Sequence, residues 1–231
     1  IAENCEWVPE NPARTLYEGL QCYCFIHVIT AYIEEPQSGD GIRFDECMGP
    51  LYEKDVEAGR INRDFAQELV ECLYVKSQEM GFLHPPVWSG AGAGGLGWQT
   101  LNLGGVDSDG NDITNEMTYI TLDAMKSIKT VTPPLALRWH KKMPEKLIYK
   151  CIELLAEGVP QPALFNDDVN IPRLMDLGVP LEDARNYSIG GCMRPTIAGK
   201  KFNHRAIWGG GITLPMCMLA ALGNSFYLQR T

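Results

Sequence analysis

One cysteine in a segment rich in glycine and proline has surroundings that favour chemistry. Cys192 directly follows the pair Gly190-Gly191 and precedes Pro195. Glycine permits close backbone approach and unusual dihedral angles, whereas proline stiffens the backbone that leaves the segment. The pattern predicts a cysteine held in a fixed place at the tip of a tight loop. From the residues alone, a buried structural cysteine stays the simpler interpretation, because most free cysteines serve as small core residues.

Three other patterns are weaker indications of a site. The glycine-rich segment 89–97 lacks the Gly-Lys-Ser/Thr ending of a phosphate-binding loop, and we interpret it as a loop that passes close to something bulky. The acidic run from Asp107 to Asp112 lacks the closing glutamate of a calcium loop and predicts a solvated turn. Cys22 and Cys24 have no second pair with which to bind zinc, so we expect no metal site.

Composition and charge indicate a soluble protein with a packed core. The 231 residues are 45 % hydrophobic and carry a net charge of −9, with acidic and basic residues interspersed. This balance disfavours nucleic-acid binding, and no apolar run is long enough for a membrane span or a signal peptide. A core of this size needs no disulfides, so we expect the eight cysteines to be reduced thiols in the cytoplasm, most of them inert and buried.

Hydrophobic periodicity predicts strands that alternate with helices. The predicted helices cover 12–33, 62–76, 115–129, 144–157, 170–177 and 181–187, and the predicted strands cover 99–107, 135–140 and 162–165. A loop is expected over 35–45. In the second helix, Phe65, Leu69, Cys72 and Leu73 should share the buried face. His140 should be a satisfied core histidine. The alternation predicts an α/β fold with a parallel-type sheet.

Several short motifs, taken together, resemble one enzyme family. In chain order they are Asn11-Pro12-Ala13-Arg14, Arg43-Phe44-Asp45, Leu51-Tyr52-Glu53-Lys54-Asp55, Asn102-Leu103-Gly104-Gly105-Val106-Asp107, Thr114-Asn115-Glu116, Asn166-Asp167, Glu182-Asp183-Ala184-Arg185 and Gly191-Cys192. The set spans nearly the whole chain. It is similar to the pattern of glycyl radical enzymes, the family of pyruvate formate-lyase, choline trimethylamine-lyase, glycerol dehydratase, the arylacetate decarboxylases and benzylsuccinate synthase.

The resemblance implies a fold and a catalytic residue. Residues 1–231 would form a single segment of a pyruvate formate-lyase-like catalytic domain, part of a barrel of parallel-type strands surrounded by helices with an internal cysteine loop. Cys192 would be the catalytic residue. Its thiol would give a hydrogen atom to a glycyl radical, and the resulting thiyl radical would take a hydrogen atom from a substrate carbon. A thiol suits this role because its S–H bond is weak enough to break and re-form reversibly.

The resemblance also implies a partner and a cofactor outside this segment. A separate activating enzyme that uses S-adenosylmethionine and an iron–sulfur cluster would install the glycyl radical on a second loop, so we expect no cofactor bound by the segment itself. No Arg-Val-Ala-Gly-Tyr-like glycyl motif is present and the first residue is not Met. The chain therefore reads as a central fragment that does not turn over alone, from a cytoplasmic homodimer or larger assembly.

Two departures from the family pattern bear on the reaction. Many members have a glutamate two residues after the cysteine, where this chain has Arg194. A guanidinium stays protonated and cannot act as a base. Met193 stands where pyruvate formate-lyase has a second, adjacent cysteine. These residues disfavour glutamate-assisted chemistry and a close match to pyruvate formate-lyase itself.

The candidate substrate-binding residues are Arg194, Arg205 and Trp98. The two arginines could bind a carboxylate, and Trp98 could form an apolar wall, although an ion-pair arginine and a core tryptophan are equally good interpretations. An apolar wall beside cations favours addition of a hydrocarbon to fumarate, as in benzylsuccinate and alkylsuccinate synthases. Alternatives within the family are an arylacetate decarboxylase, a dehydratase or a formate C-acetyltransferase-like lyase. A catalytically silent paralogue that only binds a carboxylate is the alternative from another class.

Overall fold

The computed structural model describes residues 1–29, 41–79, 100–191, 193–197, 199–200, 217–218 and 221–222. The elements in chain order are α1 (Ala2–Cys5), α2 (Leu16–His27), β1 (Ile42–Arg43), α3 (Phe44–Glu57), α4 (Arg63–Glu79), β2 (Leu101–Gly104), α6 (Glu116–Ile128), β3 (Leu135–Trp139), α7 (Glu145–Ala156), β4 (Ala163–Asn166), α8 (Asp167–Asp176), α9 (Leu181–Arg185), β5 (Tyr187–Gly190) and β6 (Arg194–Ile197).

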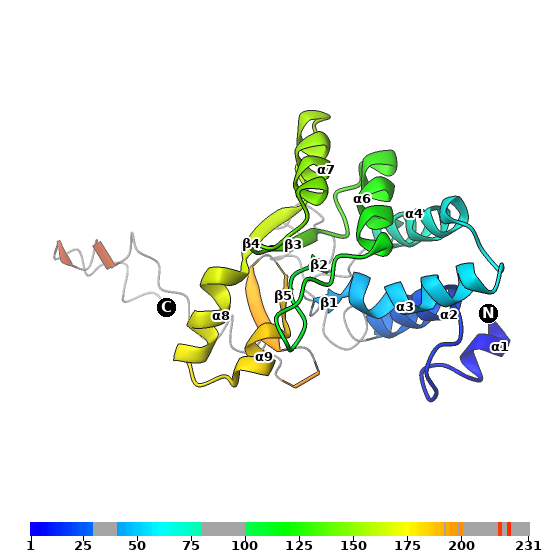
Figure 1. Ribbon diagram of the computed structural model, residues 1–231, viewed down its shortest axis with the longest axis horizontal. Coiled ribbons are helices and arrows are strands. Elements are labelled where there is room, and N and C mark those ends of the chain that lie inside the picture. Colours follow the sequence, from blue (N-terminus) through cyan, green and yellow to red (C-terminus); the bar gives the residue numbers. More distant parts are fainter. Residues whose placement is uncertain are drawn as a thin grey trace.

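Strands β1 to β4 form a parallel sheet in sequential order, and β5 and β6 form a separate antiparallel hairpin (Figure 1). Helix α6 connects β2 to β3 and α7 connects β3 to β4, as parallel neighbours require crossover connections. The parallel α/β sheet expected from the sequence is therefore confirmed. The predicted helix over 181–187 is too long, because α9 ends at Arg185 and strand β5 begins at Tyr187.

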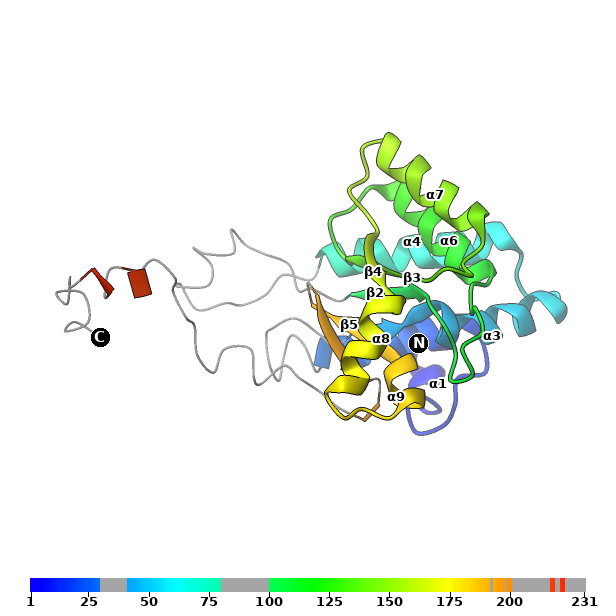
Figure 2. The same cartoon turned by 60° about the vertical axis from the view of Figure 1, so that its left-hand side comes forward.

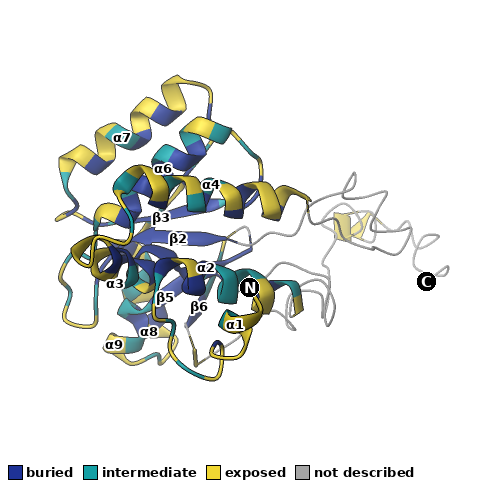
Figure 3. Cartoon of the chain, turned by 90° about the vertical axis from the view of Figure 1, so that its right-hand side faces the viewer, coloured by how far each residue is buried: buried dark blue, intermediate teal, exposed yellow. Residues whose placement is uncertain are grey.

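The two faces of the parallel sheet pack against two separate apolar clusters. Leu101 and Leu103 of β2 pack into the main apolar core with Leu135 and Leu137 of β3, together with residues of helices α2 to α4, α6 and α7. Ala136, which points to the other face, belongs to a smaller cluster with residues of α8, α9 and the hairpin. Figure 3 shows α4, α6 and α7 on one side of β2 and β3, with β5, β6, α8 and α9 on the other.

Capping and packing set the helix bounds, with some differences from expectation. Asn115 caps α6 in a reciprocal capping box with Thr118. Helix α2 begins at Leu16, four residues after Pro12, because Thr15 accepts the backbone N–H of Glu18. Helix α3 and strand β1 were not expected.

The buried face of α4 also differs from the sequence prediction. It consists of Ala66, Val70, Leu73, Tyr74 and Ser77, whereas Phe65 and Cys72 are exposed. The predicted face was wrong by one residue along the chain, although Leu73 is buried as predicted and Leu69 packs against the core. Within the described ranges, none of the helices combines the length and apolar character that a bilayer crossing needs.

A buried charge pair joins the sheet to the elements on its second face. Arg138 of β3 is fully buried, and its guanidinium donates to both carboxylate oxygens of Asp167 at 3.0 and 2.8 Å. The same guanidinium lies 4.1 Å from the centre of the Tyr187 ring, and the Tyr187 hydroxyl donates to Asp167. Burial, followed by the charge of Asp167, raises the pKa of the Tyr187 hydroxyl, so Tyr187 stays a donor.

We predict that Asp167→Asn destabilises the complete protein by about 3–5 kcal/mol, because it leaves the Arg138 charge buried without its counter-ion. The adjacent Asp168→Asn is the matched control, since Asp168 is partly exposed and lies 3.5 Å from the exposed ammonium of Lys141. Its cost should stay below about 1 kcal/mol. Urea denaturation measures both, and equal losses for the two variants would contradict the assignment.

Candidate functional site

The segment that contains Cys192 is the turn of the β5–β6 hairpin. The last pair of the hairpin joins Gly190 to Arg194, so residues 191–193 connect the strands. Gly191 has φ +59°, a left-handed conformation that side chains disfavour, which agrees with the prediction of a tight loop that needs glycine. Gly191 and Met193 are described, whereas Cys192 itself lies outside the described residues.

Asn102 of β2 binds the hairpin strand through both atoms of its side-chain amide. Its Oδ1 accepts the N–H of Ile189 at 2.6 Å, and its Nδ2 donates to the Ile189 carbonyl oxygen at 3.0 Å. Ile189 is paired across the hairpin with Pro195, and its N–H and carbonyl oxygen both point away from β6, toward Asn102. The amide of Asn102 therefore satisfies a backbone donor and acceptor that the hairpin leaves on its outer side.

Two further residues fit the end of the hairpin against the beginning of β2. The hydroxyl of Thr100 donates to the carbonyl oxygen of Gly191, the residue before Cys192. Gly41 lies so close to the hairpin that a Cβ there would overlap the Ile189 carbonyl oxygen and the amide of Asn102. Both observations indicate close packing of backbone on backbone at the cysteine end.

Two buried arginines hold the opposite end of β5. Arg138 donates to the carbonyl oxygens of Tyr187 and Arg185 at 2.9 and 2.8 Å. Arg43 of β1 donates to the side-chain oxygen of Asn186 at 2.7 Å and pairs with Glu46 at 2.9 Å. Burial, followed by the nearby charge of Arg138, lowers the pKa of Arg43.

Asp45, in the first turn of α3, binds the carboxyl end of β2. This fully buried carboxylate accepts from the N–H of Gly104 at 2.7 Å and from the hydroxyl of Thr118 at 2.6 Å. Burial raises the pKa of Asp45 to about 6, although these hydrogen bonds oppose that rise. Helix α3, strand β2 and helix α6 are therefore tied together where the strand ends.

This geometry matches known proteins over nearly all of the chain. The model of the family described as "Pyruvate formate lyase-like" matches residues 1–230. The chain is 32 % identical to trans-4-hydroxy-L-proline dehydratase of Clostridioides difficile over 98 % of its own length and 28 % of that protein. The chain belongs to the pyruvate formate-lyase-like family of glycyl radical enzymes.

Two more family relatives support the same assignment. Isethionate sulfite-lyase of Nitratidesulfovibrio vulgaris is 34 % identical over 83 % of this chain and 23 % of that protein. The glycerol-bound form of the B12-independent glycerol dehydratase of Clostridium butyricum superposes with a TM-score of 0.77 at 36 % identity, covering 86 % of this chain and 25 % of that one. The chain thus spans about a quarter of the length of these relatives.

The glycyl radical enzyme resemblance expected from the motifs is therefore confirmed, and the structure shows what several of the motifs do. Four residues of the quoted motifs each bind another element of the fold or the hairpin: Asn102, Asp45, Asp167 and Arg185. Arg185 donates to the Ser108 carbonyl oxygen at 2.8 Å. Sequence reasoning assigned no role to Asn102, although a polar residue within a strand buried on both faces was an available signal.

Of the predicted site residues, the structure describes Arg194 alone. It is partly buried and begins β6, beside Gly190. Cys192, Trp98 and Arg205 lie outside the described residues, as does the glycine-rich segment 89–97. Their roles therefore stay predictions.

The other cysteines and polar candidates have structural surroundings. The seven described cysteines are free thiols, as expected, but Cys151 is the one buried among them, so the prediction that most lie in the core is wrong. Burial raises the pKa of Cys151 to about 11.

His140 is buried and lies 3.0 Å from Asp112, which confirms a satisfied core histidine. Asp107 accepts two backbone N–H groups in an exposed turn, as predicted for that segment.

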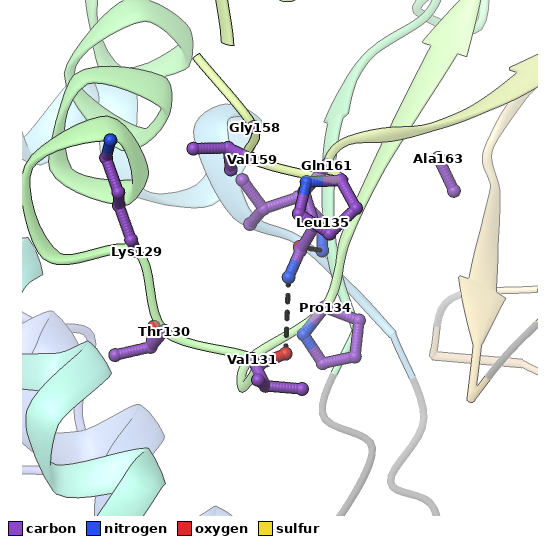
Figure 4. A pocket seen from close by; sticks show the side chains of 10 residues that line it. Lys129, Thr130, Val131, Pro134, Leu135, Gly158, Val159, Gln161 and Ala163 are labelled. Carbon is purple, nitrogen blue, oxygen red and sulfur yellow. Dashed lines mark hydrogen bonds between the residues drawn. The ribbon is translucent and has the colours of Figure 1, made fainter. Parts of the chain in front are cut away.

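A pocket occurs at the amino-terminal ends of strands β3 and β4 (Figure 4). Its lining includes Val131, Pro134, Val159 and Gln161, and Gln161 donates to the Val131 carbonyl oxygen at 3.2 Å. The lining residues are distinct from those that bind the hairpin. The pocket is therefore a feature separate from the cysteine segment.

We predict that Gly41→Ala lowers the stability of the complete protein by about 3 kcal/mol, because the new Cβ meets backbone that cannot rotate away. Gly178→Ala is the control: Gly178 has φ +84° with open space around it, so its cost of about 1 kcal/mol reports left-handed strain alone. Chemical denaturation compares the two, and a Gly41→Ala cost no larger than that of Gly178→Ala would contradict the close approach.

Proposed function

We propose that this chain provides the hydrogen-abstracting cysteine, Cys192, of a glycyl radical lyase that acts on a small anionic substrate. The observation that carries the proposal is a Gly-Cys turn whose preceding strand, β5, and Gly191 are bound by buried polar side chains of Asn102, Thr100 and Arg138. Such a turn suits a sulfur atom that must meet a substrate carbon repeatedly in one geometry. Family membership supplies the chemistry that this geometry would serve.

The chain's own residues fit a close approach by a second protein loop. Gly190 and Gly191 carry no side chain beyond hydrogen, so backbone from elsewhere could reach the turn. The glycyl radical, installed by an S-adenosylmethionine-dependent iron–sulfur activating enzyme, supplies the oxidising equivalent that converts the Cys192 thiol to a thiyl radical. The activating enzyme and a homodimeric or larger assembly are parts of the same proposal.

The proposed reaction is an elimination. Cys192 takes a hydrogen atom from a substrate carbon. A leaving group then departs from the neighbouring carbon with its bonding electrons, and the substrate radical gives up one proton, so that the leaving group and the proton together are lost as the neutral or protonated product. The product radical then recovers a hydrogen atom from the Cys192 thiol, so that the thiyl radical is restored. The relatives' names support this class, because they describe loss of water from trans-4-hydroxy-L-proline and of sulfite from isethionate.

Arg194 would bind the acidic group of the substrate. It stands two residues after Cys192 and is partly buried, which strengthens a charge-assisted pair with a carboxylate or sulfonate. Because a guanidinium cannot accept a proton, the base that takes the proton lost by the substrate would have to come from another residue.

Fumarate addition is the second candidate, favoured by the same residue. An arginine in place of the family's glutamate removes a base that addition does not need and provides a cation for the two carboxylates of fumarate. Arg205 and Trp98 stay the predicted second cation and apolar wall.

A catalytically silent paralogue that only binds a carboxylate is the remaining alternative. Turnover of any substrate by the activated protein would exclude it.

We predict that Cys192→Ala in the complete, anaerobically activated protein abolishes turnover while the glycyl radical signal in electron paramagnetic resonance persists, because abstraction from carbon needs the thiol and radical installation does not. Cys72→Ala, at an exposed thiol, is the control and should change kcat by less than about twofold. Product formation is followed with trans-4-hydroxy-L-proline, isethionate, glycerol, and fumarate with toluene. Turnover by Cys192→Ala would refute the proposed function.

We predict that Arg194→Met raises KM for an anionic substrate by about 10- to 100-fold, the effect of losing one charge-assisted interaction. Lys200→Met is the control, because Lys200 is an exposed cation just beyond β6 that pairs with Asp183 at 2.5 Å. Its KM should match the wild type. Equal KM values for Arg194→Met and the wild type would exclude Arg194 from substrate binding, and a succinate-type product would select fumarate addition over elimination.

A further inference from the structure

We propose that Asn102 is the positioning residue that fixes the register of the cysteine hairpin on the sheet, assisted by Thr100. The inference rests on the proposed role of Cys192, but its structural part stands on described atoms. Asn102 would act through the backbone of Ile189, three residues before Cys192, and never touch the substrate.

The bonding pattern of Asn102 is directional. One planar amide donates to and accepts from the same residue, Ile189, at 3.0 and 2.6 Å, as a neighbouring β-strand would. The Nδ2 group also lies 3.2 Å from the Ile42 carbonyl oxygen of β1. Because β1 and β2 are themselves paired at Arg43 and Asn102, one side chain relates the hairpin to two strands of the sheet.

Apolar packing alone cannot provide this register. The side chains of Tyr187 and Ile189 pack in the smaller core, which keeps the hairpin against the sheet. Apolar contacts are not directional, so they would tolerate sliding along β2. Nearer the cysteine, Gly190 and Gly191 have no side chains to pack. The hydrogen bonds from Asn102 and Thr100 are therefore the directional contacts nearest the cysteine, and they set how far the turn extends beyond the end of β5 that Arg138 holds.

The strand that carries Asn102 is itself firmly held. Leu101 and Leu103 flank it in sequence and are fully buried in the main core on the opposite face. Asp45 binds the N–H of Gly104 at the carboxyl end of β2. Movement of Asn102 would require disruption of that core, so it is a rigid reference point for the hairpin.

The test compares Asn102→Leu, which has a similar volume and no amide, with Leu103→Ala. Leu103 is the adjacent residue on the other face, so Leu103→Ala weakens the core while the polar contacts to the hairpin remain. In the complete activated protein, Asn102→Leu should lower kcat by about 10- to 100-fold with KM within about threefold and the glycyl radical signal retained. Leu103→Ala, measured at a temperature where it is folded, should keep kcat within about threefold.

A second readout needs no radical and no substrate. In the unactivated protein, the rate of Cys192 alkylation by iodoacetamide, resolved by peptide mass spectrometry, should rise about tenfold in Asn102→Leu and less than about threefold in Leu103→Ala. Thr100→Val keeps the shape and removes the hydroxyl that binds Gly191, and it should produce a smaller rise in the same direction. It also keeps the proposal testable if Asn102→Leu does not fold.

The outcomes separate the two proposals. Equal kcat losses, or equal alkylation rates, in Asn102→Leu and Leu103→Ala would overturn the positioning role, as would a wild-type Cys192 that reacts as fast as exposed Cys72. Faster alkylation in Asn102→Leu together with turnover by Cys192→Ala would uphold the positioning of the hairpin and refute the radical function instead.

Discussion

Two hydrogen bonds between one side-chain amide and the backbone of Ile189 join the cysteine hairpin to the parallel sheet. Asn102 provides both of them, and Thr100 and Gly41 complete the fit at the cysteine end. A buried polar group is stable when it is fully bonded and costly when it is not, so such contacts specify one position for the hairpin. The main apolar core on the opposite face supports the strand from which Asn102 projects.

The far end of the hairpin is held by two charged side chains. Arg138, with its counter-ion Asp167, binds two carbonyl oxygens at the beginning of β5, and Arg43 binds Asn186 next to them. Figure 2 shows α8, which carries Asp167, beside β5. Strand β5 is thus bound at both ends through directional contacts, as the proposed role of Cys192 requires.

Much of the fold could be predicted from sequence because hydrophobic periodicity and caps are local. The helix over 144–157 corresponds to α7 and the strand over 135–140 to β3, each within about one residue of the observed bounds.

The elements that were missed depend on contacts that are distant in sequence. Helix α3 was missed because Gly49 and Pro50 lie inside it and lower its local helical propensity. The packing of Phe44 and Met48 in the main core overrides that low propensity. The hairpin was missed because strand β5 is short and depends on long-range bonds to Asn102 and Arg138. The catalytic role of Cys192 was predicted from its flanking glycines and the family motifs and stays a prediction, whereas the residues that bind its hairpin needed the structure.

Native-state hydrogen exchange of the Ile189 amide in the wild-type protein tests the central claim most directly. This N–H belongs to a short strand near a turn, where fast exchange is the ordinary expectation. If Asn102 holds it as the 2.6 Å contact indicates, it should exchange as slowly as the amide of Leu137 in the middle of the parallel sheet. Exchange through local opening, many times faster than at Leu137, would contradict the account, because the hairpin would then not be fixed to the sheet.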